Sequence, residues 1–518
     1  MDVDTSLKTI LKGAGFFFIG AIFSKAFSFV YAIVTARWLG PSDYGLLNIG
    51  IMFLGIGTIL STFGLNAGVM RFVSYYKSKG KEDYVKGVVL TSVKIVILTS
   101  ILVSLFFYLI SPYLAYVFFG EEGLLAIMPV FILAMPFNTL RQLFVFISRG
   151  FNNAKYPVYA EQFFMQPVRF FLTILFLLFG LGVVGVSTAV MFSVIMTSLL
   201  MLYFLEFRVH KIFRSKVKAK TDVKRLLSYS WPLAFTPMIY ILLTWTDTLM
   251  IGYFLNAAAV GIYNVARPAS VLIMVFPDSL NMLFVPVITS LYALRKKDEM
   301  RSVYLSVSKW IFIACLPLFL LFVVFPDNIL TILFDSRYVS AAMPLSVLSL
   351  GYFLSVITGP GGGILSSLEK TKLLLFTSLV AACLNVVLNI VLIPVFGITG
   401  AALATSLSII SQYWMNMIIA NKHMRIIPFG KHYVRPLFAG GLSILLIYTI
   451  KNTFPLSLLW VAFLFALFWS LYLMFLVLFR AFDEKDLKMI NAVEKRTGIR
   501  MGFIRSVLKK IARRSHQW

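Results

Sequence analysis

Acidic residues and cysteines are scarce in this sequence. Only 21 of its 518 residues are Asp or Glu, charged residues make up 13% of the chain, and there are two cysteines. Soluble globular chains carry about 25% charged residues, so this composition excludes an ordinary soluble enzyme. Cys315 and Cys383 stand in separate apolar runs without a CxxC pair. We therefore expect neither a disulfide nor a metal site.

Motifs for bond-making chemistry are also missing. The sequence contains no GxxxxGK(S/T) phosphate-binding loop, so it gives no indication that ATP hydrolysis powers the protein. Membrane-bound glycosyltransferases and polymerases need carboxylates or bases, often on a large outer loop, and no outer loop here exceeds about 20 residues. We expect no enzymatic activity, no catalytic residue and no cofactor, with a coupling Na⁺ or H⁺ left open.

Apolar residues dominate instead, at 60% of the chain with a mean hydropathy of +0.89. About 20 apolar residues span a bilayer, and unbroken runs of that length in lipid must be helices. The sequence therefore predicts an all-α polytopic membrane protein with about 14 transmembrane helices. The predicted spans lie near 13–36, 44–70, 87–111, 124–148, 158–179, 183–205, 228–253, 258–289, 303–325, 341–366, 373–394, 399–421, 436–450 and 457–479.

Lys and Arg are distributed unevenly over the predicted loops. With a cytoplasmic N-terminus, 39 of the 47 basic residues lie in or next to cytoplasmic segments, three in outer loops and five within spans. The positive-inside rule then predicts a plasma-membrane protein with both termini in the cytoplasm. The net charge of +26 accordingly reflects topology and attraction to anionic headgroups, and we expect no nucleic acid partner.

Three sequence similarities recur at a nearly constant offset. Residues 39–45 (LGPSDYG) match 255–261 (LNAAAVG), and residues 150–155 (GFNNAK) match 366–371 (SSLEKT), both at an offset of 216. A third match, between the turns that follow spans 5 and 11, has an offset of 215. Spans 1–6 and 7–12 are therefore predicted to be two copies of one six-helix unit. Since six is even, their pseudo-twofold axis runs along the membrane normal.

The repeat predicts how the chain is divided. Spans 13 and 14 lie outside it, and two similar bundles facing each other form the usual frame for alternating access. The tail contains an apolar-basic pattern that predicts a helix on the inner leaflet, with a partner-binding segment as the alternative. The predicted parts are an N-lobe (1–208), a basic cytoplasmic linker (209–227), a C-lobe (228–425), two extra helices (426–480) and a basic cytoplasmic tail (481–518).

Three motifs resemble a known family. Residues 38–46 (WLGPSDYGL), 260–266 (VGIYNVA) and 393–402 (IPVFGITGAA) are similar to the polysaccharide-transporter branch of the multidrug/oligosaccharidyl-lipid/polysaccharide (MOP) exporter superfamily. The resemblance covers residues 10–480. It implies a two-lobed flippase that moves polyprenyl-diphosphate-linked oligosaccharides from the cytoplasmic to the outer leaflet for cell-surface glycan synthesis. Its expected partners are the lipid-linked oligosaccharide, membrane lipids and glycan-assembly enzymes.

An ion-coupled multidrug or cation exporter of the same superfamily is the alternative. Cationic substrates would favour acidic cavities. The deep polar residues of this chain include three bases, Lys25, Arg169 and Arg267, and two acids, Asp247 and Asp278. This balance favours an anionic substrate.

Polar residues form a stripe along span 5. Gln162, Gln166, Arg169 and Thr173 follow at i, i+4, i+7 and i+11 and so share one helical face. An ion in the middle of the bilayer costs about 2.5–3.5 kcal/mol, so Arg169 is expected to face a cavity or a partner.

The second copy of the repeat keeps a neutral stripe. Adding 216 to the span 5 positions leads to Asn385 and Asn389 in span 11, which could equally form hydrogen bonds between helices of one lobe. Basic side chains would neutralise a diphosphate, and Asn, Gln and Tyr would bind sugar hydroxyls. The predicted substrate-binding residues are Lys25, Gln162, Gln166, Arg169, Tyr240, Arg267, Asn385 and Asn389.

Two acids lie deep in spans 7 and 8. Asp278 follows Arg267 by 11 residues, which places it about 20° from the same helical face. Asp247 and Asp278 are predicted to serve ion coupling or an ion pair, and Asp247 could pair with Arg267. Pro268 and Pro277 predict a bend in span 8.

Four further basic residues, Lys94, Arg141, Arg149 and Lys309, lie toward the cytoplasmic ends of their spans. We expect their side chains to reach the membrane interface. Glu121, in an outer loop, is expected to be solvated.

Overall fold

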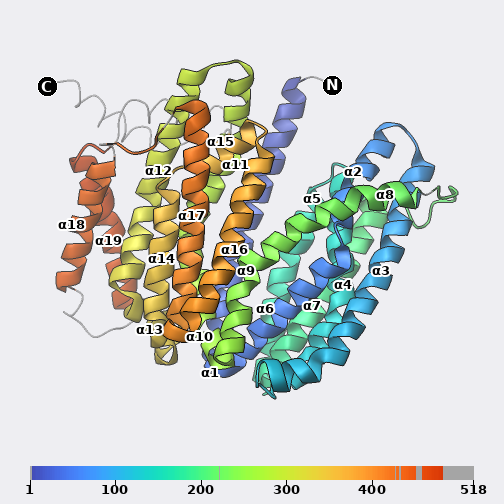
Figure 1. Ribbon diagram of the computed structural model, residues 1–518, viewed down its shortest axis with the longest axis horizontal. Coiled ribbons are helices and arrows are strands. Elements are labelled where there is room, and N and C mark those ends of the chain that lie inside the picture. The colour runs from blue at the N-terminus through green and yellow to red at the C-terminus, as the bar shows by residue number, and fades with distance from the viewer. Residues whose placement is uncertain (1–2, 221, 426, 431–432, 451–457, 482–518) are drawn as a thin grey trace. The chain divides into compact units, whose positions relative to one another are not determined.

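A computed structural model describes residues 3–220, 222–425, 427–430, 433–450 and 458–481 of the chain. Within these ranges the regular structure is entirely helical (Figure 1). Nine of the described helices are long and apolar enough to span a membrane, and Val223–Ile239 with Ile241–Phe254, bent by 45°, form a tenth candidate. The prediction of an all-α multi-pass membrane protein is confirmed, whereas the count of 14 spans stays a prediction.

The chain divides into two compact units. The first unit comprises Met1–Val265 and Ile393–Ile398. In it α4 packs against α1, α2, α3 and α7. With η marking 3₁₀ or π turns, the bounds are α1 (Val3–Thr62), α2 (Leu65–Ser78), α3 (Glu82–Tyr113), η1 (Leu114–Phe118), α4 (Leu124–Gly150), α5 (Lys155–Val158), η2 (Tyr159–Phe164), α6 (Met165–Leu178), α7 (Gly182–Phe204), η3 (Leu205–Val209), α8 (Val223–Ser230), η4 (Trp231–Ala234), α9 (Phe235–Phe254) and α10 (Ala257–Val271).

The second unit comprises Ala266–Leu392 and Thr399–Trp518, described as far as residue 481. In it α12 packs against α11, α14 and α18. The further bounds are η5 (Leu272–Met274), α11 (Val275–Ala293), α12 (Lys297–Val324), α13 (Pro326–Phe334), η6 (Ser336–Ala341), α14 (Ala342–Val356), α15 (Gly361–Ser367), α16 (Thr371–Phe396), α17 (Ile398–Met424), α18 (Val434–Ile450) and α19 (Leu458–Leu478).

The division by packing differs from the predicted division by repeat. The boundary between the units falls inside α10, because α8 packs against α2, and α9 packs against the second half of α1, where Gly55 meets Trp245. The predicted bounds of the lobes and the linker were derived from the sequence repeat, which a division by packing does not test, so they stay predictions. The predicted inner-leaflet helix of the tail falls within 482–518, which lies outside the described residues.

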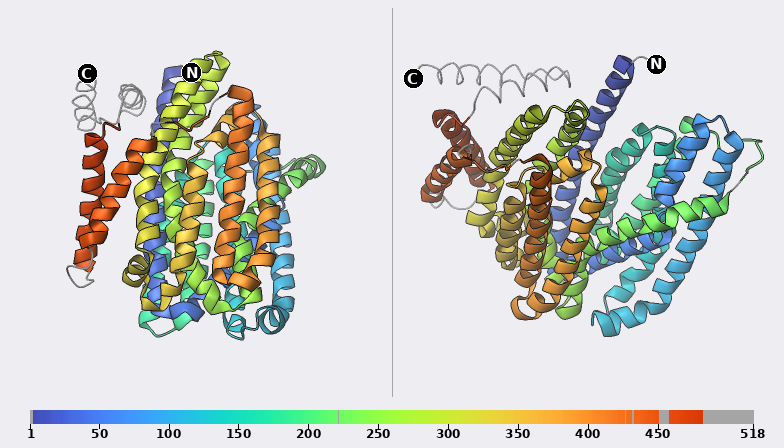
Figure 2. Two further views of the ribbon diagram at one scale, coloured as in Figure 1. Left: turned by 60° about the vertical axis from the view of Figure 1, so that its left-hand side comes forward. Right: turned by 45° about the horizontal axis from the view of Figure 1, so that its top comes forward.

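The first two predicted spans form the single element α1, which changes direction at Gly40 (Figures 1 and 2). Gly40 has φ +78° and ψ 174°, a conformation that glycine adopts without steric cost. The predicted span 44–70 extends too far, because α1 ends at Thr62. A left-handed Gly64 then starts the separate helix α2.

Two glycines of the predicted repeat contact one another within the first unit. A Cβ atom on Gly45 would lie 1.7 Å from the carbonyl oxygen of Ala257, and a Cβ on Gly261 would lie 1.9 Å from that of Pro41. The contact is reciprocal, since Gly45 and Gly261, like Pro41 and Ala257, differ by the repeat offset of 216. The two backbones meet where only hydrogen fits between them.

Glu121 lies at the same end of the unit and is not simply solvated, contrary to our expectation. Its carboxylate accepts a 2.7 Å hydrogen bond from the backbone N–H of Ala257, the first residue of α10. A carboxylate at this position satisfies one of the N–H groups that the first turn of a helix leaves unpaired.

Span 8 is interrupted as its prolines predict. The 3₁₀ turn η5 separates α10 from α11 between Pro268 and Pro277. Two further helices, α18 and α19, lie together beside α12 and α13 in the second unit (Figure 2). Their shared apolar cluster contains Leu321, Phe325, Ile444, Ile447 and Phe468.

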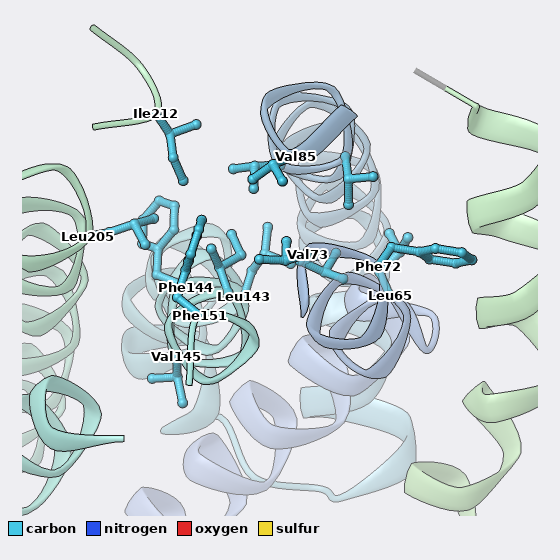
Figure 3. Close-up of a cluster of buried hydrophobic side chains, with 14 of the residues drawn as sticks. Leu65, Phe72, Val73, Val85, Leu143, Phe144, Val145, Phe151, Leu205 and Ile212 are labelled. Carbon is cyan, nitrogen blue, oxygen red and sulfur yellow. The ribbon is translucent and has the colours of Figure 1, made fainter. Parts of the chain in front are cut away.

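The segment after α7 is anchored to the first unit by buried apolar side chains. Ile212 and Leu205 point into a cluster that also holds Val85 and Phe144 (Figure 3), and Leu226 of α8 belongs to the same cluster. The segment predicted as a linker is therefore packed against helix ends rather than free along its length.

We predict that Gly45→Ala and Gly261→Ala each destabilise the protein, because the added methyl group would overlap a backbone carbonyl. Overpacking of this kind costs about 1–3 kcal/mol. Thermal unfolding of the detergent-purified chain, followed by tryptophan fluorescence, measures the loss. Gly441→Ala is the matched control, since its Cβ would meet open space. Equal stability of all three variants would contradict the close contact.

Candidate functional site

The stripe predicted on span 5 lies against the first half of α1. The Arg169 Nη2 donates a 2.6 Å hydrogen bond to Gln166 Oε1, which also accepts a 3.3 Å bond from Ser28 Oγ of α1. The Arg169 guanidinium carbon lies 4.2 Å from the centre of the Tyr31 ring. A cation over an aromatic face is stabilised by the ring quadrupole, so Tyr31 fixes the plane of the guanidinium.

Unpaired polar atoms accompany this cluster. Within the described part of the chain, Tyr31 Oη, Gln162 Oε1, Arg169 Nε and Thr173 Oγ1 are buried and have no hydrogen-bond partner. Buried polar atoms are nearly always paired, because an unpaired one costs about 1–3 kcal/mol. The cluster therefore offers two hydroxyls, an amide oxygen and a guanidinium N–H to water or to a ligand.

The helix that carries the stripe contains a π turn, η2, which includes Gln162. Here α1 comes so close that a Cβ on Gly20 would lie 2.0 Å from Gln162 Oε1. Farther along both helices, Phe27 and Phe170 pack edge to face at 6.0 Å. The contacts advance along α1 and η2–α6 in the same order, so the two helices run in the same direction, as the predicted topology requires of spans 1 and 5.

The neutral stripe of the second unit has a different environment. Asn385 and Asn389 on α16 are 3% and 0% exposed. Asn385 Nδ2 donates to Thr405 Oγ1 of α17 at 3.1 Å, and Asn389 Nδ2 donates to Asn385 Oδ1 at 3.2 Å. The bond from Asn385 to Thr405 joins two helices of the second unit. Hydrogen bonding between helices was the alternative to substrate binding that the sequence analysis gave for these residues.

Asp247 is buried between α9 and α10. It is 3% exposed, and Tyr263 Oη donates a 2.6 Å hydrogen bond to its Oδ2. One residue farther along each helix, Asn264 Nδ2 donates to the Val260 carbonyl at 2.9 Å and approaches Thr248 Oγ1 at 3.4 Å. Tyr263 is a partner of Asp247 that the sequence analysis did not anticipate.

The other predicted site residues are more dispersed. Lys25 on α1 and Asp278 on α11 are exposed, and Arg267 on α10 is half-buried. The side chain of Tyr240 lies outside what the structure describes. Among the described residues, no group of three or more His, Cys, Asp or Glu side chains could hold a metal ion.

An internal ion pair was missed by the sequence analysis. Arg141 does not reach the interface as expected: it is 8% exposed and pairs with Glu161 of η2. Its Nε and Nη2 also donate to Asn138 Oδ1 at 3.1 and 2.9 Å, and Asn138 Nδ2 donates to Thr58 Oγ1 at 2.9 Å. The i, i+3 spacing of Asn138 and Arg141 was the available signal, but the position of Glu161 beside them depends on tertiary packing.

The other basic residues near span ends have varied environments. Lys309 of α12 is 4% exposed, so it is also not at the surface as expected. Lys94 is exposed and Arg149 is half-buried, with its guanidinium carbon 5.3 Å from the centre of the Phe146 ring. These two positions are compatible with the expected reach to the interface.

The fold of this chain resembles that of solved membrane transporters. The lipid II flippase MurJ, in an inward closed conformation, superposes with a TM-score of 0.73 over 89% of this chain and 98% of its own, at 15% identity. That identity shows the fold alone, and the same two-lobed fold is shared by a solved multidrug resistance transporter of the MOP superfamily, with a TM-score of 0.65 over 76% of this chain and 94% of its own, at 14% identity. The predicted fold class is confirmed.

The family follows from the sequence itself. The family model described as "Polysaccharide biosynthesis protein" matches residues 10–292, and a second model, MatE, matches residues 232–391. The chain therefore belongs to the polysaccharide biosynthesis protein family, and the predicted resemblance to the polysaccharide-transporter branch is confirmed.

Two curated relatives cover most of the chain. An uncharacterized membrane protein of Methanocaldococcus jannaschii is 23% identical over 85% of this chain and 90% of its own length. The probable low-salt glycan biosynthesis flippase of Haloferax volcanii is 26% identical over 76% of this chain and 79% of its own length. Both matches extend over the two units.

We predict that Arg141→Met destabilises the chain, because it leaves the Glu161 carboxylate without its cation. Breaking a buried pair costs about 3–5 kcal/mol, and the lower end applies here because the Glu161 side chain is 28% exposed. Thermal unfolding in detergent measures the effect. The double variant Arg141→Met/Glu161→Met should recover part of the loss, and Arg149→Met is the control with little effect. A single variant as stable as this control would contradict the structural role.

Proposed function

We propose that this protein is a flippase that moves polyprenyl-diphosphate-linked oligosaccharides from the cytoplasmic to the outer leaflet of the plasma membrane. Both termini then lie in the cytoplasm, and the protein performs no covalent chemistry. Its family, the name of its Haloferax volcanii relative as a glycan biosynthesis flippase, and its likeness in fold to a lipid II flippase support the proposal. Glycan-assembly enzymes on either side of the membrane are the proposed partners.

The Arg169 cluster is the observation on which the proposal depends. A guanidinium presents N–H donors in a planar fork that matches two phosphate oxygens, and it stays charged at any physiological pH. The Tyr31 ring packs against the face of the Arg169 guanidinium, while Arg169 Nε has no hydrogen-bond partner among the described residues. A diphosphate is the anionic group that this donor set suits.

The remaining polar atoms suit the sugar chain. Tyr31 Oη and Thr173 Oγ1 can donate or accept, and Gln162 Oε1 can accept from a sugar hydroxyl. The polyprenyl tail has no polar group and can stay in the lipid while the headgroup crosses. In this mechanism, rocking of the two lobes exposes the headgroup site first to the cytoplasm and then to the outside.

Arg169→Ala is expected to reduce flipping at least tenfold, because a charge-assisted contact to phosphate contributes about 1.5–3 kcal/mol. The assay reconstitutes the chain in liposomes with a labelled polyprenyl-diphosphate oligosaccharide. A membrane-impermeant glycan-processing enzyme then reports its exposure. Arg169→Lys should retain part of the activity. Lys94→Ala, which removes an exposed basic residue of α3, is the matched control. Full activity of folded Arg169→Ala would refute the proposed site.

Asp247 is the proposed coupling residue. Carboxylates buried within membrane spans are rare and typically belong to ion pathways, and Asp247 is held in place by the hydroxyl of Tyr263. If an imposed Na⁺ or H⁺ gradient accelerates flipping by the wild-type chain, Asp247→Asn should abolish that acceleration and leave the gradient-free rate within about twofold. Asp278→Asn serves as the comparison, because Asp278 is exposed on α11. An unchanged gradient response in Asp247→Asn would exclude this role.

The MatE match over residues 232–391 is what favours the second candidate, an ion-coupled exporter of cations. The same liposomes distinguish the two. Gradient-driven efflux of a cationic dye without exposure of the lipid-linked glycan would support the exporter.

A further inference from the structure

We propose that the first unit carries a binding site for an anionic membrane phospholipid, formed where the linker folds back over the ends of α3, α4 and α7. Two adjoining hollows mark the site. One, of about 510 Å³, is largely apolar, and the other, of about 610 Å³, is lined by the linker. Glu206, Phe207 and Arg214 line both, so the two hollows adjoin at these residues.

The apolar hollow lies between three membrane helices. Its walls include Ile97 of α3, Leu140 of α4 and Leu199 of α7. Ile97 and Leu199 are 38% and 56% exposed, so the hollow opens on the outer surface of the helices. In a membrane protein such a surface faces lipid, and a groove in it accommodates an acyl chain.

The linker hollow is basic at its mouth. Arg208, Lys211 and Arg214 line it, and all three are exposed. Two carboxylates also line it, but both already have partners. Glu206 accepts three backbone N–H bonds at 2.9–3.0 Å, and Glu82 accepts a 2.8 Å bond from His210. The three basic side chains are therefore available to an external anion.

Glu206 places Arg214 at the junction of the two hollows. One of its three hydrogen bonds comes from the Arg214 backbone N–H, at 2.9 Å. The Arg214 guanidinium carbon lies 4.5 Å from the centre of the exposed Phe207 ring. Phe207 in turn stacks on the Tyr203 ring at 5.0 Å. The ring fixes one face of the guanidinium, and the described residues give its N–H edge no hydrogen-bond acceptor. A phosphodiester accepts two such N–H groups side by side.

Aromatic and basic residues in this order mark a membrane interface. Tyr203 and Phe207 are 45% and 48% exposed, and the basic side chains follow directly along the chain. Aromatic rings favour the headgroup level, and Lys and Arg favour its water side. An acyl chain in the apolar hollow would therefore place its phosphate beside Arg214. Apolar groove and basic mouth together fit one occupant, a phospholipid with net negative charge.

Native mass spectrometry of the purified full chain tests the site. Phosphatidylglycerol and phosphatidylcholine with identical acyl chains are titrated separately. We expect the first phosphatidylglycerol to bind at least tenfold more tightly than phosphatidylcholine. Arg208→Gln/Lys211→Gln/Arg214→Gln should remove this preference, since a hydrogen bond to a charged group is worth about a factor of ten or more.

The matched control removes the same number of positive charges from the same stretch of chain between α7 and α9. Lys216, Lys218 and Lys224 are exposed and line neither hollow, so Lys216→Gln/Lys218→Gln/Lys224→Gln should keep the preference. Leu199→Trp, which fills the apolar hollow at an exposed position, should weaken binding of both lipids.

Three results would overturn the proposal. They are equal binding of the two lipids, an equal loss in the control triple variant, or competition by glycerol phosphate as strong as by the intact lipid. The last would mean that the basic mouth binds a free phosphate without the groove. The outcome is independent of flipping, because binding is measured without a transport substrate.

Discussion

The reciprocal backbone contact between Gly45 and Gly261 is the constraint on which the first unit depends. Each glycine lies where a Cβ would fall within 2 Å of a carbonyl oxygen of the other segment. The two glycines stand 216 residues apart, the offset of the predicted repeat, so the same position of each predicted copy supplies one half of the contact. It joins the second half of α1 to α10, and α9 packs along the same half of α1. The start of the second repeat thereby becomes part of the first compact unit.

Two arginines of the first unit show two ways of keeping a cation among apolar helices. Arg141 is balanced by Glu161 and by the amide of Asn138, so its charge and its donors are satisfied inside the protein. Arg169 has a tyrosine ring and a neutral amide, but no carboxylate, among its contacts with the described residues. A cation balanced in this second way retains its attraction for an external anion, and that difference separates a structural arginine from a candidate binding residue.

Charge has a further role in the segment that follows α7. The Glu206 carboxylate accepts hydrogen bonds from three backbone N–H groups and so holds the chain folded back on itself. The fold-back buries Ile212 against Val85 and Leu205 and leaves the basic side chains on the outside. A segment with net positive charge is thus held against the ends of the helices, and its basic side chains form the mouth of the proposed lipid site.

The sequence alone determined the class and the stripe of Arg169, because these depend on composition and on the helical period, and it predicted the repeat from offsets along the chain. It could not determine that Asn385 bonds Thr405, that Glu161 pairs with Arg141, or that Glu121 caps α10. Each of these contacts joins residues of different helices, and no local period encodes which helices become neighbours. The tertiary structure decided these contacts. Whether a polar side chain finds a partner inside the protein or stays exposed depends on how closely the helix backbones can approach. Glycines such as Gly45 set that distance, and the sequence shows them without showing what they face.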